Sequence, residues 1–225
     1  MPRRIWAIAD LHLSHAQPKP MDIFGEHWKD HPARIWENCH KVIAEDDLLL
    51  LPGDLSWAMK RAEAQPDLEW LASLPGIKVL CKGNHDYWWD SDRPLNFPGL
   101  HDTPWVADDG SLGVAGTRGW PPPAPQMDDA ERASCEKIIT REVARLEKRL
   151  AAIAVCSRKY ALVHYPPLDE FAPLLHAHGV DTVLYGHLHL NGREHPLPET
   201  WQGLRALCVA ADRLHFAPRL VGTWD

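Results

Sequence analysis

The sequence has 225 residues, of which 45% are hydrophobic and 24% are charged. This composition excludes a disordered protein and suits one sizeable core, so we expect a single domain over residues 1–225. The formal net charge of −7 gives no general attraction for polyanions, which makes nucleic acid an unfavoured partner.

The first part of the chain alternates short apolar runs with helix-like segments. Strands are predicted at residues 5–9, 48–51 and 77–81, because apolar runs of this length are typical of strands buried on both faces. Residues 18–31 show no clear period and are predicted to form a loop. Helical spacing appears at residues 32–44 and 61–74; the latter is interrupted near Pro66, where Asp67 is a plausible N-cap. This alternation predicts a parallel sheet with covering helices.

The middle of the chain predicts a hairpin and a long helix. Residues 103–107 and 112–116 are expected to be strands joined by the turn Asp108-Asp109-Gly110. The stiff segment 120–125 is rich in proline and precedes a helix over residues 128–154. An apolar stripe runs along that helix, and we expect it to cover a sheet; its members are Ile139, Val143, Leu146, Leu150 and Ile153.

The last part of the chain returns to the strand-and-helix pattern. Further strands are predicted at residues 160–163, 182–185, 206–210 and 220–221. A short helix over residues 171–178 separates the first two of these strands. Its end is predicted at Gly179, because glycine favours the position just after a helix.

Metal-ligand residue types follow five of the predicted strands. The clusters are Asp10-Leu11-His12, Gly53-Asp54, Gly83-Asn84-His85-Asp86, His164 and Gly186-His187-Leu188-His189. Each cluster alone has an ordinary explanation, such as a helix N-cap, a polar turn or a hydrogen-bonded core histidine. Together, in this order and at strand ends, they predict a two-metal site.

The donor atoms in these clusters are nitrogen and oxygen. No cysteine enters them, which excludes an iron–sulfur site. Four histidines with two aspartates and one asparagine suit Mn, Fe, Zn, Co or Ni better than Ca or Mg. We therefore expect two divalent transition-metal ions per chain.

The five clusters resemble the signature of the calcineurin-like metallophosphoesterases. The match covers residues 10–189, and the stretches 19–25, 53–59, 85–89 and 116–120 resemble an uncharacterised bacterial branch of that family. The resemblance implies an α/β fold, a four-layer α/β/β/α sandwich with two mixed sheets and a site at the C-terminal ends of the strands. It also implies a metal-dependent phosphoesterase.

The same resemblance implies how the two ions are bound. One ion would be held by Asp10, His12, Asp54 and His189. The second would be held by Asp54, Asn84, His164 and His187, so that Asp54 bridges the pair. His85 matches the residue that protonates the leaving group in this family.

A mechanism follows from that arrangement. Two cations lower the pKa of a bridging water and grip the phosphoryl oxygens, and the resulting hydroxide attacks phosphorus in line. His85 then protonates the departing alkoxide. Asp86 is a candidate for orienting His85.

Aromatic and basic residues near the motifs are candidates for substrate binding. Trp57, Tyr87 and Trp88, with Trp89 and Trp120, could stack a nucleobase at a pocket rim or could instead be core residues. Lys19, Arg118 and Arg193 could anchor phosphate or could be solvated surface charges. His15 and His195 lie near the clusters in sequence and could support them or be exposed.

The sequence thus predicts hydrolysis of a small phosphomonoester or phosphodiester. A nuclease of the same chemistry is the alternative, although duplex binding needs positive charge that this chain lacks. A non-catalytic scaffold would require eroded ligands, and none is eroded. Five scattered cysteines without C-x-x-C spacing predict reduced thiols and a cytoplasmic location. No run is long enough to span a membrane, and the oligomeric state stays open.

Overall fold

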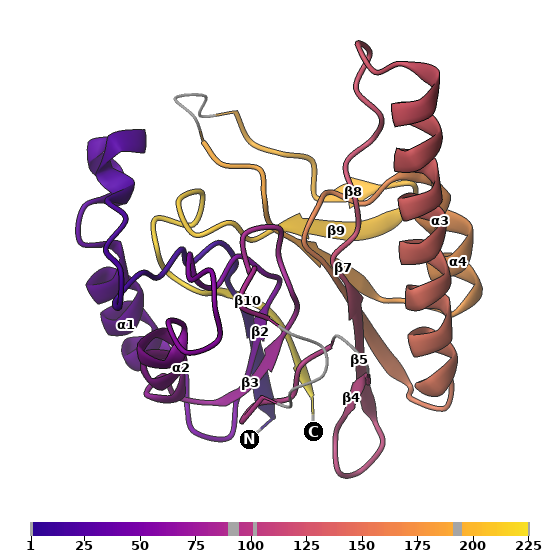
Figure 1. The fold of residues 1–225 in the computed structure, drawn as a ribbon. Helices are drawn as coiled ribbons and strands as arrows, with labels where there is room; N and C mark the ends of the chain where they lie inside the picture. The colour runs from indigo at the N-terminus through magenta and orange to yellow at the C-terminus, as the bar shows by residue number, and fades with distance from the viewer. Residues whose placement is uncertain (1, 90–94, 101–102, 191–194, 225) are drawn as a thin grey trace.

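Two sheets form the centre of the computed structural model, which describes residues 2–89, 95–100, 103–190 and 195–224 (Figure 1). The first sheet has the order β10-β1-β2-β3, in which β1, β2 and β3 are parallel and β10 is antiparallel to β1. Its strands are β1 (Arg3–Ala7), β2 (Leu48–Leu51), β3 (Ile77–Leu80) and β10 (Arg219–Trp224).

The second sheet has the order β4-β5-β6-β7-β9-β8. Its four inner strands run parallel, and the edge strands β4 and β8 are antiparallel to their neighbours. The strands are β4 (Trp105–Val106), β5 (Leu112–Thr117), β6 (Arg158–Val163), β7 (Thr182–Tyr185), β8 (Thr200–Trp201) and β9 (Leu204–Cys208). The predicted hairpin is present as β4 and β5, whereas β8 was not predicted.

Helices cover the outer face of each sheet. In Figure 1, α1 (His31–Val42) and α2 (Gln65–Ala72) lie outside the first sheet, and α3 (Asp129–Ala152) and α4 (Ala172–Ala177) lie outside the second. Three short 3₁₀ turns complete the helical elements; they are η1 (Met21–Phe24), η2 (Glu26–Trp28) and η3 (Asp169–Phe171). The predicted α/β/β/α sandwich with two mixed sheets is therefore confirmed.

The alternation of side chains along each buried strand explains the layers. Leu48 and Leu50 of β2 point between the sheets, while Leu49 and Leu51 point toward α1 and α2. In β6, Leu162 packs between the sheets and its neighbours pack against α3 and α4. Because successive side chains leave opposite faces of a strand, both faces must be apolar and both must be covered.

Helix α3 carries the predicted apolar stripe. Asp128 and Glu131 form a reciprocal capping box at its start, with backbone-to-carboxylate distances of 2.8 and 3.0 Å. Leu146, Leu150 and Ile153 are fully buried against the second sheet. The helix therefore covers the sheet as expected.

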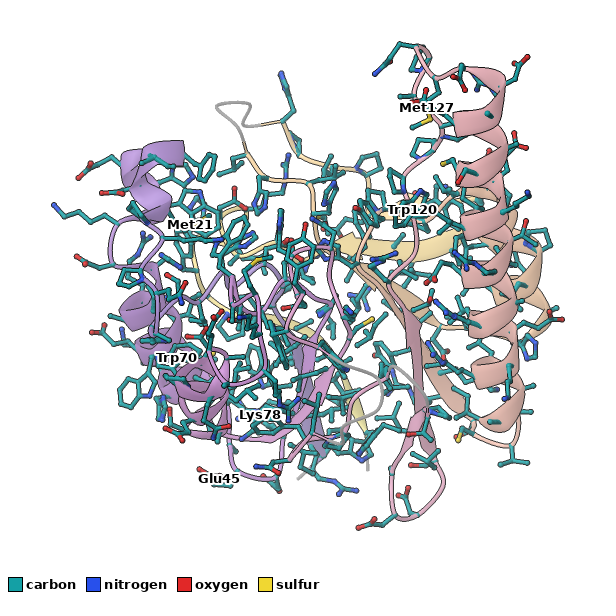
Figure 2. All side chains as sticks on the ribbon, in the orientation of Figure 1. Met21, Glu45, Trp70, Lys78, Trp120 and Met127 are labelled. Atoms are coloured by element: carbon teal, nitrogen blue, oxygen red, sulfur yellow. The ribbon has the colours of Figure 1, made fainter. Side chains whose placement is uncertain are left out.

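The carboxyl ends of the parallel strands lie at one edge of the sandwich. Figure 2 shows Met21 and Trp120 near that upper edge, whereas Glu45 and Lys78, which precede or begin strands, lie at the lower edge. Loops that leave the strands at the upper edge are thus brought together from both sheets.

Two local predictions were wrong. The segment 18–31 is not irregular throughout, because η1 and η2 form single turns separated by Gly25, whose φ of 136° only glycine adopts readily. Helix α2 begins at Gln65 rather than near residue 61, because Pro66 favours the first helical turn. Asp67 therefore lies inside α2 and is not its N-cap; its carboxylate accepts bonds from Ser56 Oγ and from the backbone and ring of His15.

Among the described residues, no helix has the length and hydropathy needed to cross a bilayer.

Candidate metal centre

The five ligand-type clusters meet at the carboxyl edge of the two sheets. Asp10 and His12 follow β1, Asp54 follows β2 and Asn84 follows β3, all from the first sheet. His164 follows β6, and His187 and His189 follow β7, both from the second sheet. The structure therefore brings together all seven residues that the sequence nominated as ligands.

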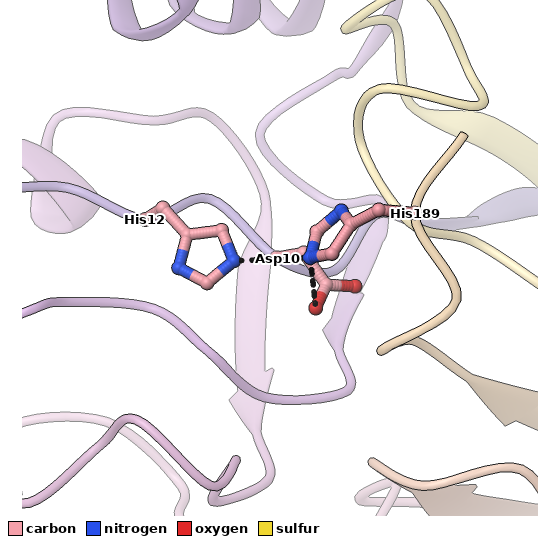
Figure 3. A group of neighbouring side chains, drawn as sticks. All are labelled: Asp10, His12 and His189. Carbon is pink, nitrogen blue, oxygen red and sulfur yellow. Dashed lines mark hydrogen bonds and ion pairs between the residues drawn. The ribbon is translucent and has the colours of Figure 1, made fainter. Parts of the chain in front are cut away.

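The first group of donor atoms faces one small space (Figure 3). The Nε2 atoms of His12 and His189 lie 3.3 Å apart, and His189 Nε2 is 3.7 Å from Asp10 Oδ1. Asp54 Oδ2 lies 4.0 Å from His12 Nε2. A carboxylate and two imidazole nitrogens that converge in this way match the donors that borderline divalent metals prefer.

A second group lies on the other side of Asp54. His164 Nε2 is 3.3 Å from Asp54 Oδ2 and 2.7 Å from Asn84 Oδ1. His187 Nδ1 is 3.0 Å from the same amide oxygen. Asp10 also belongs near this group, since its carboxylate lies within 4.8 Å of the donor atoms of Asp54 and His164. The Asp54 carboxylate thus contacts donors of both groups, as a bridging ligand must.

The backbone is strained where it presents these side chains. Four of the seven residues have left-handed φ angles, which are 59° at Asp10, 47° at His12, 53° at Asp54 and 69° at His187. Such conformations cost on the order of 1 kcal/mol or more each and are concentrated at functional sites. Left-handed backbone at four of the seven nominated ligands supports this edge as a candidate functional site.

Close backbone packing fixes Asp54. A Cβ atom on Gly53 would lie 2.7 Å from Gly83 Cα, and one on Gly83 would overlap the Asp54 carboxylate. The loops after β2 and β3 can therefore approach each other only through glycine. The backbone amide of His85 donates to Asp54 Oδ1 at 2.8 Å, which orients that carboxylate.

Electrostatics divide the centre into an ion pair and neutral imidazoles. Burial alone would raise the pKa of Asp54, but His164 and His12 outweigh it and hold that pKa below its usual range. Burial opposes the charge on His164 as well, yet attraction to Asp54 raises its pKa to about 9. Burial lowers the pKa of His12 to about 3 and of His187 to about 4, so both are neutral, as metal ligation requires. Burial raises the pKa of Asp10 to about 7.

Asp212 supports the centre and was missed in the sequence. Its carboxylate lies 3.2 Å from His189 Nδ1 and accepts from the backbone amides of Leu190 and Arg213. These bonds hold the pKa of Asp212 below its usual range despite burial. The ionised carboxylate also helps to raise the pKa of His189 despite burial, and it accepts from Nδ1, so that Nε2 is the ring nitrogen that faces the other donors. The only signal was a single aspartate shortly after the strand predicted at residues 206–210.

Trp28 is the second supporting residue that the sequence did not reveal. The segment before α1 that was predicted to be a loop buries Trp28, which packs edge-on against His12 and His189 at centroid distances of 5.9 and 5.5 Å. Trp57 also stacks on the His12 ring, at a centroid distance of 4.8 Å. Because His12 Nδ1 has no hydrogen-bond partner among the described residues, these two rings hold the imidazole in place.

His85, the expected proton donor, borders the centre. Its Nε2 lies 4.0 Å from Asp54 Oδ2, and its ring packs on Trp57 at 4.2 Å. Burial lowers its pKa, partly offset by attraction to Asp54. The side chain is partly exposed and can therefore reach a bound molecule.

Two expectations about the neighbours of His85 were wrong. Asp86 does not orient His85, because its carboxylate accepts bonds from the amides of Leu55, Ser56 and Gly83 and from the indole of Trp88. Trp88 cannot line a pocket rim, since it is only 1% exposed and packs in the core. Trp89 is buried beside it.

The remaining aromatic and basic candidates lie on opposite sides of the centre. Tyr87 is exposed near His85, and Lys19 Nζ lies 4.7 Å from the ring of Trp57. Arg118 lies on the His164 side, where its carbonyl accepts from the His164 amide at 3.1 Å and its guanidinium covers the ring of Trp120.

Three nominated residues remain, of which one lies outside the described residues and two do not join the donor groups. Arg193 lies outside the described residues. His15 is bonded to Asp67, away from the donor groups, and the carbonyl of His195 accepts from Arg213.

Comparisons with known proteins agree with this geometry. A sequence model of the family described as calcineurin-like phosphoesterase matches residues 3–191. No curated protein sequence matches the chain.

Solved structures of similar fold span almost the whole chain. A phosphopantetheinyl hydrolase from Mycobacterium tuberculosis superposes with a TM-score of 0.59 and 17% identity over 98% of this chain and 96% of that one. A protein from Thermus thermophilus gives a TM-score of 0.56 and 15% identity over 99% of both chains. A protein of unknown function from Aquifex aeolicus gives 0.52 and 17% over 96% of this chain and 94% of that one. At these identities the similarity shows the fold alone.

Proposed function

The chain belongs to the calcineurin-like phosphoesterase family, and on that premise we propose that it uses two metal ions to hydrolyse a small phosphomonoester or phosphodiester. The family makes it a metal-dependent phosphoesterase. The observation that carries the finer proposal is the position of the Asp54 carboxylate between two groups of donor atoms.

The residues present fit a pair of cations. His12 and His189 direct ring nitrogens at each other at 3.3 Å, and Asn84 Oδ1 faces ring nitrogens of both His164 and His187. Groups of this kind crowd together where a cation satisfies their lone pairs.

We assign the ligands as the resemblance implies. One ion would be held by Asp10, His12, Asp54 and His189, and the other by Asp54, Asn84, His164 and His187. The donor set of nitrogen and oxygen supports Mn, Fe or Zn. When bound, such ions supply positive charge for the phosphoryl oxygens and lower the pKa of a water molecule.

The chain's own residues would orient and complete the reaction. Asp212 and Trp28 hold His189 and His12 in position, and the glycine contact between the loops after β2 and β3 fixes Asp54. His85 would donate a proton to the leaving alkoxide, a step worth roughly 10²–10⁴-fold in rate. Arg118, Lys19, Trp57 and Tyr87 are the described residues that we propose for contacting the substrate.

The net charge and the cysteines support the substrate class and the cellular compartment that we propose. The net charge of −7 favours a small substrate over a nucleic acid. All five cysteines are buried and free, which supports a reducing compartment such as the cytoplasm.

A combined screen tests this function. Phosphomonoesters, phosphodiesters, cyclic nucleotides and a single-stranded oligonucleotide should be assayed with Mn, Zn and Fe supplied separately. We expect two ions per active chain by elemental analysis, and we expect Asp54→Ala to lose most metal and all activity. Asp109→Ala is the matched control, because Asp109 is an exposed carboxylate in the turn between β4 and β5 that bonds only Ser111 among the described residues. One ion or none in fully active wild-type protein would refute the dinuclear assignment.

A further inference from the structure

An apolar cavity opens directly beside the candidate metal centre. It has a volume of about 170 Å³ and lies next to His12, His85 and His189. Its other walls are Met21 and Phe24 of η1, Trp28 of η2 and Trp57 after β2. We call this cavity the η1 pocket. Apart from the three imidazoles, its lining side chains are aromatic rings and a thioether.

The position of the η1 pocket relates it to one end of the substrate. His85 forms part of its wall and packs on Trp57 at a centroid distance of 4.2 Å. A group that protonates a leaving alkoxide must lie within hydrogen-bond reach of that oxygen. The organic part of a leaving alcohol that His85 protonates would therefore lie next to the η1 pocket.

The volume of the η1 pocket limits what it can hold. An apolar cavity of about 150 Å³ accommodates benzene. A pocket of about 170 Å³ therefore fits a single aromatic ring or a short aliphatic chain. The side chain of Phe24 is 58% exposed and continues the apolar surface of the pocket outward.

The chemistry of the pocket walls favours the binding of a hydrocarbon group over the binding of a nucleobase. Apart from the three imidazoles on the side of the metal centre, the lining side chains offer no amide, hydroxyl or carboxylate to the polar edge of a base. Burying such an edge without partners costs free energy, whereas apolar contact with rings and methionine is favourable. Of the basic residues nominated for binding, Lys19 lies over the ring of Trp57, which forms part of the pocket wall.

We propose that the η1 pocket binds the leaving group of the substrate and that this group is apolar, so that the enzyme acts on phosphoesters of aromatic or aliphatic alcohols. This inference rests on the proposed function and adds the substrate class. It differs from nucleobase stacking, which was one of the two interpretations that the sequence left open for the aromatic residues.

The test compares leaving groups of similar acidity and different apolar size. Ethyl and 2-phenylethyl phosphate, and their methyl diesters, should be assayed with the manganese-loaded protein. We expect kcat/KM for the 2-phenylethyl ester to be about tenfold higher or more, as is typical when an apolar pocket is filled. Phe24→Ala should reduce this preference to below about threefold. Ile23→Ala, one residue away on the same turn and outside the pocket lining, should keep the wild-type preference.

A binding measurement separates the pocket from the chemistry. Saturation-transfer NMR with 2-phenylethanol and ethanol as probes should show contact for 2-phenylethanol alone, and the signal should weaken in Phe24→Ala. Hydrolysis of both esters with equal kcat/KM, or equal effects of the two variants, would overturn the inference and leave the proposed function standing. The protein could instead bind 2-phenylethanol in a manner that depends on Phe24 and yet hydrolyse no ester with any metal. That result would support the pocket and refute the proposed function.

Discussion

Replacing Asp212 with asparagine should weaken metal binding, although asparagine has nearly the same shape. Three donors face the Asp212 carboxylate: Oδ1 accepts from His189 Nδ1 at 3.2 Å and from the Arg213 amide at 3.0 Å, and Oδ2 accepts from the Leu190 amide at 2.8 Å. An asparagine supplies one acceptor and one donor, so a donor must face a donor in either orientation of the amide.

The cost of that conflict can be worked from the geometry. If the amide oxygen of the introduced asparagine faces His189, its NH₂ group faces the Leu190 amide, which is also a donor. If the oxygen faces Leu190 instead, the NH₂ group faces the Arg213 amide and His189 Nδ1, and the His189 proton must move from Nδ1 to Nε2. A lost bond to a buried donor costs about 1–3 kcal/mol. Supporting partners of metal-binding histidines are typically worth about 10–100-fold in affinity, and we expect a loss of that size.

Chelator competition with Zn, combined with elemental analysis, measures this loss. Asp47→Asn is the matched control. Asp47 is also a buried carboxylate and accepts from the backbone amides of Arg4 and Ala44. It precedes β2, however, and therefore lies at the end of that strand opposite to the metal centre. It should keep wild-type metal affinity. Wild-type affinity in Asp212→Asn, or an equal loss in Asp47→Asn, would refute the role that we give to the Asp212–His189 bond.

Four further outcomes are expected. Removing metal with a chelator should lower the melting temperature by several degrees and Zn should restore it, because ions that bind the native state alone stabilise it; calorimetry that shows no change would contradict this. His85→Asn should slow hydrolysis of an alkyl ester far more than that of a nitrophenyl ester, whose leaving group needs no proton, and equal losses would indicate a positioning role. Burial opposes the charge on Asp47, but bonds to Ala44, Arg4 and Trp6 outweigh it and hold the pKa below its ordinary value of 3.8. The resulting stabilisation is present above about pH 4 and is lost as pH falls through the folded-state pKa. In urea titrations Asp47→Asn should therefore cost about 1–3 kcal/mol at pH 7 and less in acid. Arg118→Ala should lower kcat/KM by roughly 10–150-fold with both metals retained, and Arg118→Lys should recover only part of it; wild-type kinetics with a lower melting temperature would show a structural role instead.

The elements that the sequence predicted well have purely local causes. The strands at Leu48–Leu51 and Thr182–Tyr185 have the predicted bounds, since each is a short apolar run between turn or cap signals. The ligand-type residues could be nominated because parallel strands place their carboxyl ends at one edge, whatever the rest of the fold. Local pattern and strand direction were therefore sufficient to predict which ligand-type residues converge.

The parts that the sequence did not reveal depend on contacts between distant residues. Trp28 lies in a segment without periodicity, and it packs against His189, which is far away in the chain. Asp86 and Trp88 belong to a nominated motif, yet their bond to each other and the amides around Asp86 place them in the core. A motif indicates which residue types are available, but tertiary packing decides which of them face the substrate.

The left-handed backbone at Asp10, His12, Asp54 and His187 has a consequence for how related chains diverge. Natural proteins stay just above the stability they need, and strained positions are maintained only while function requires them. In a lineage that stops using this chemistry, glycine or asparagine at these four positions would relieve strain and be accepted early. We therefore expect these positions to separate active from inactive members of a collection of relatives sooner than the buried strands do.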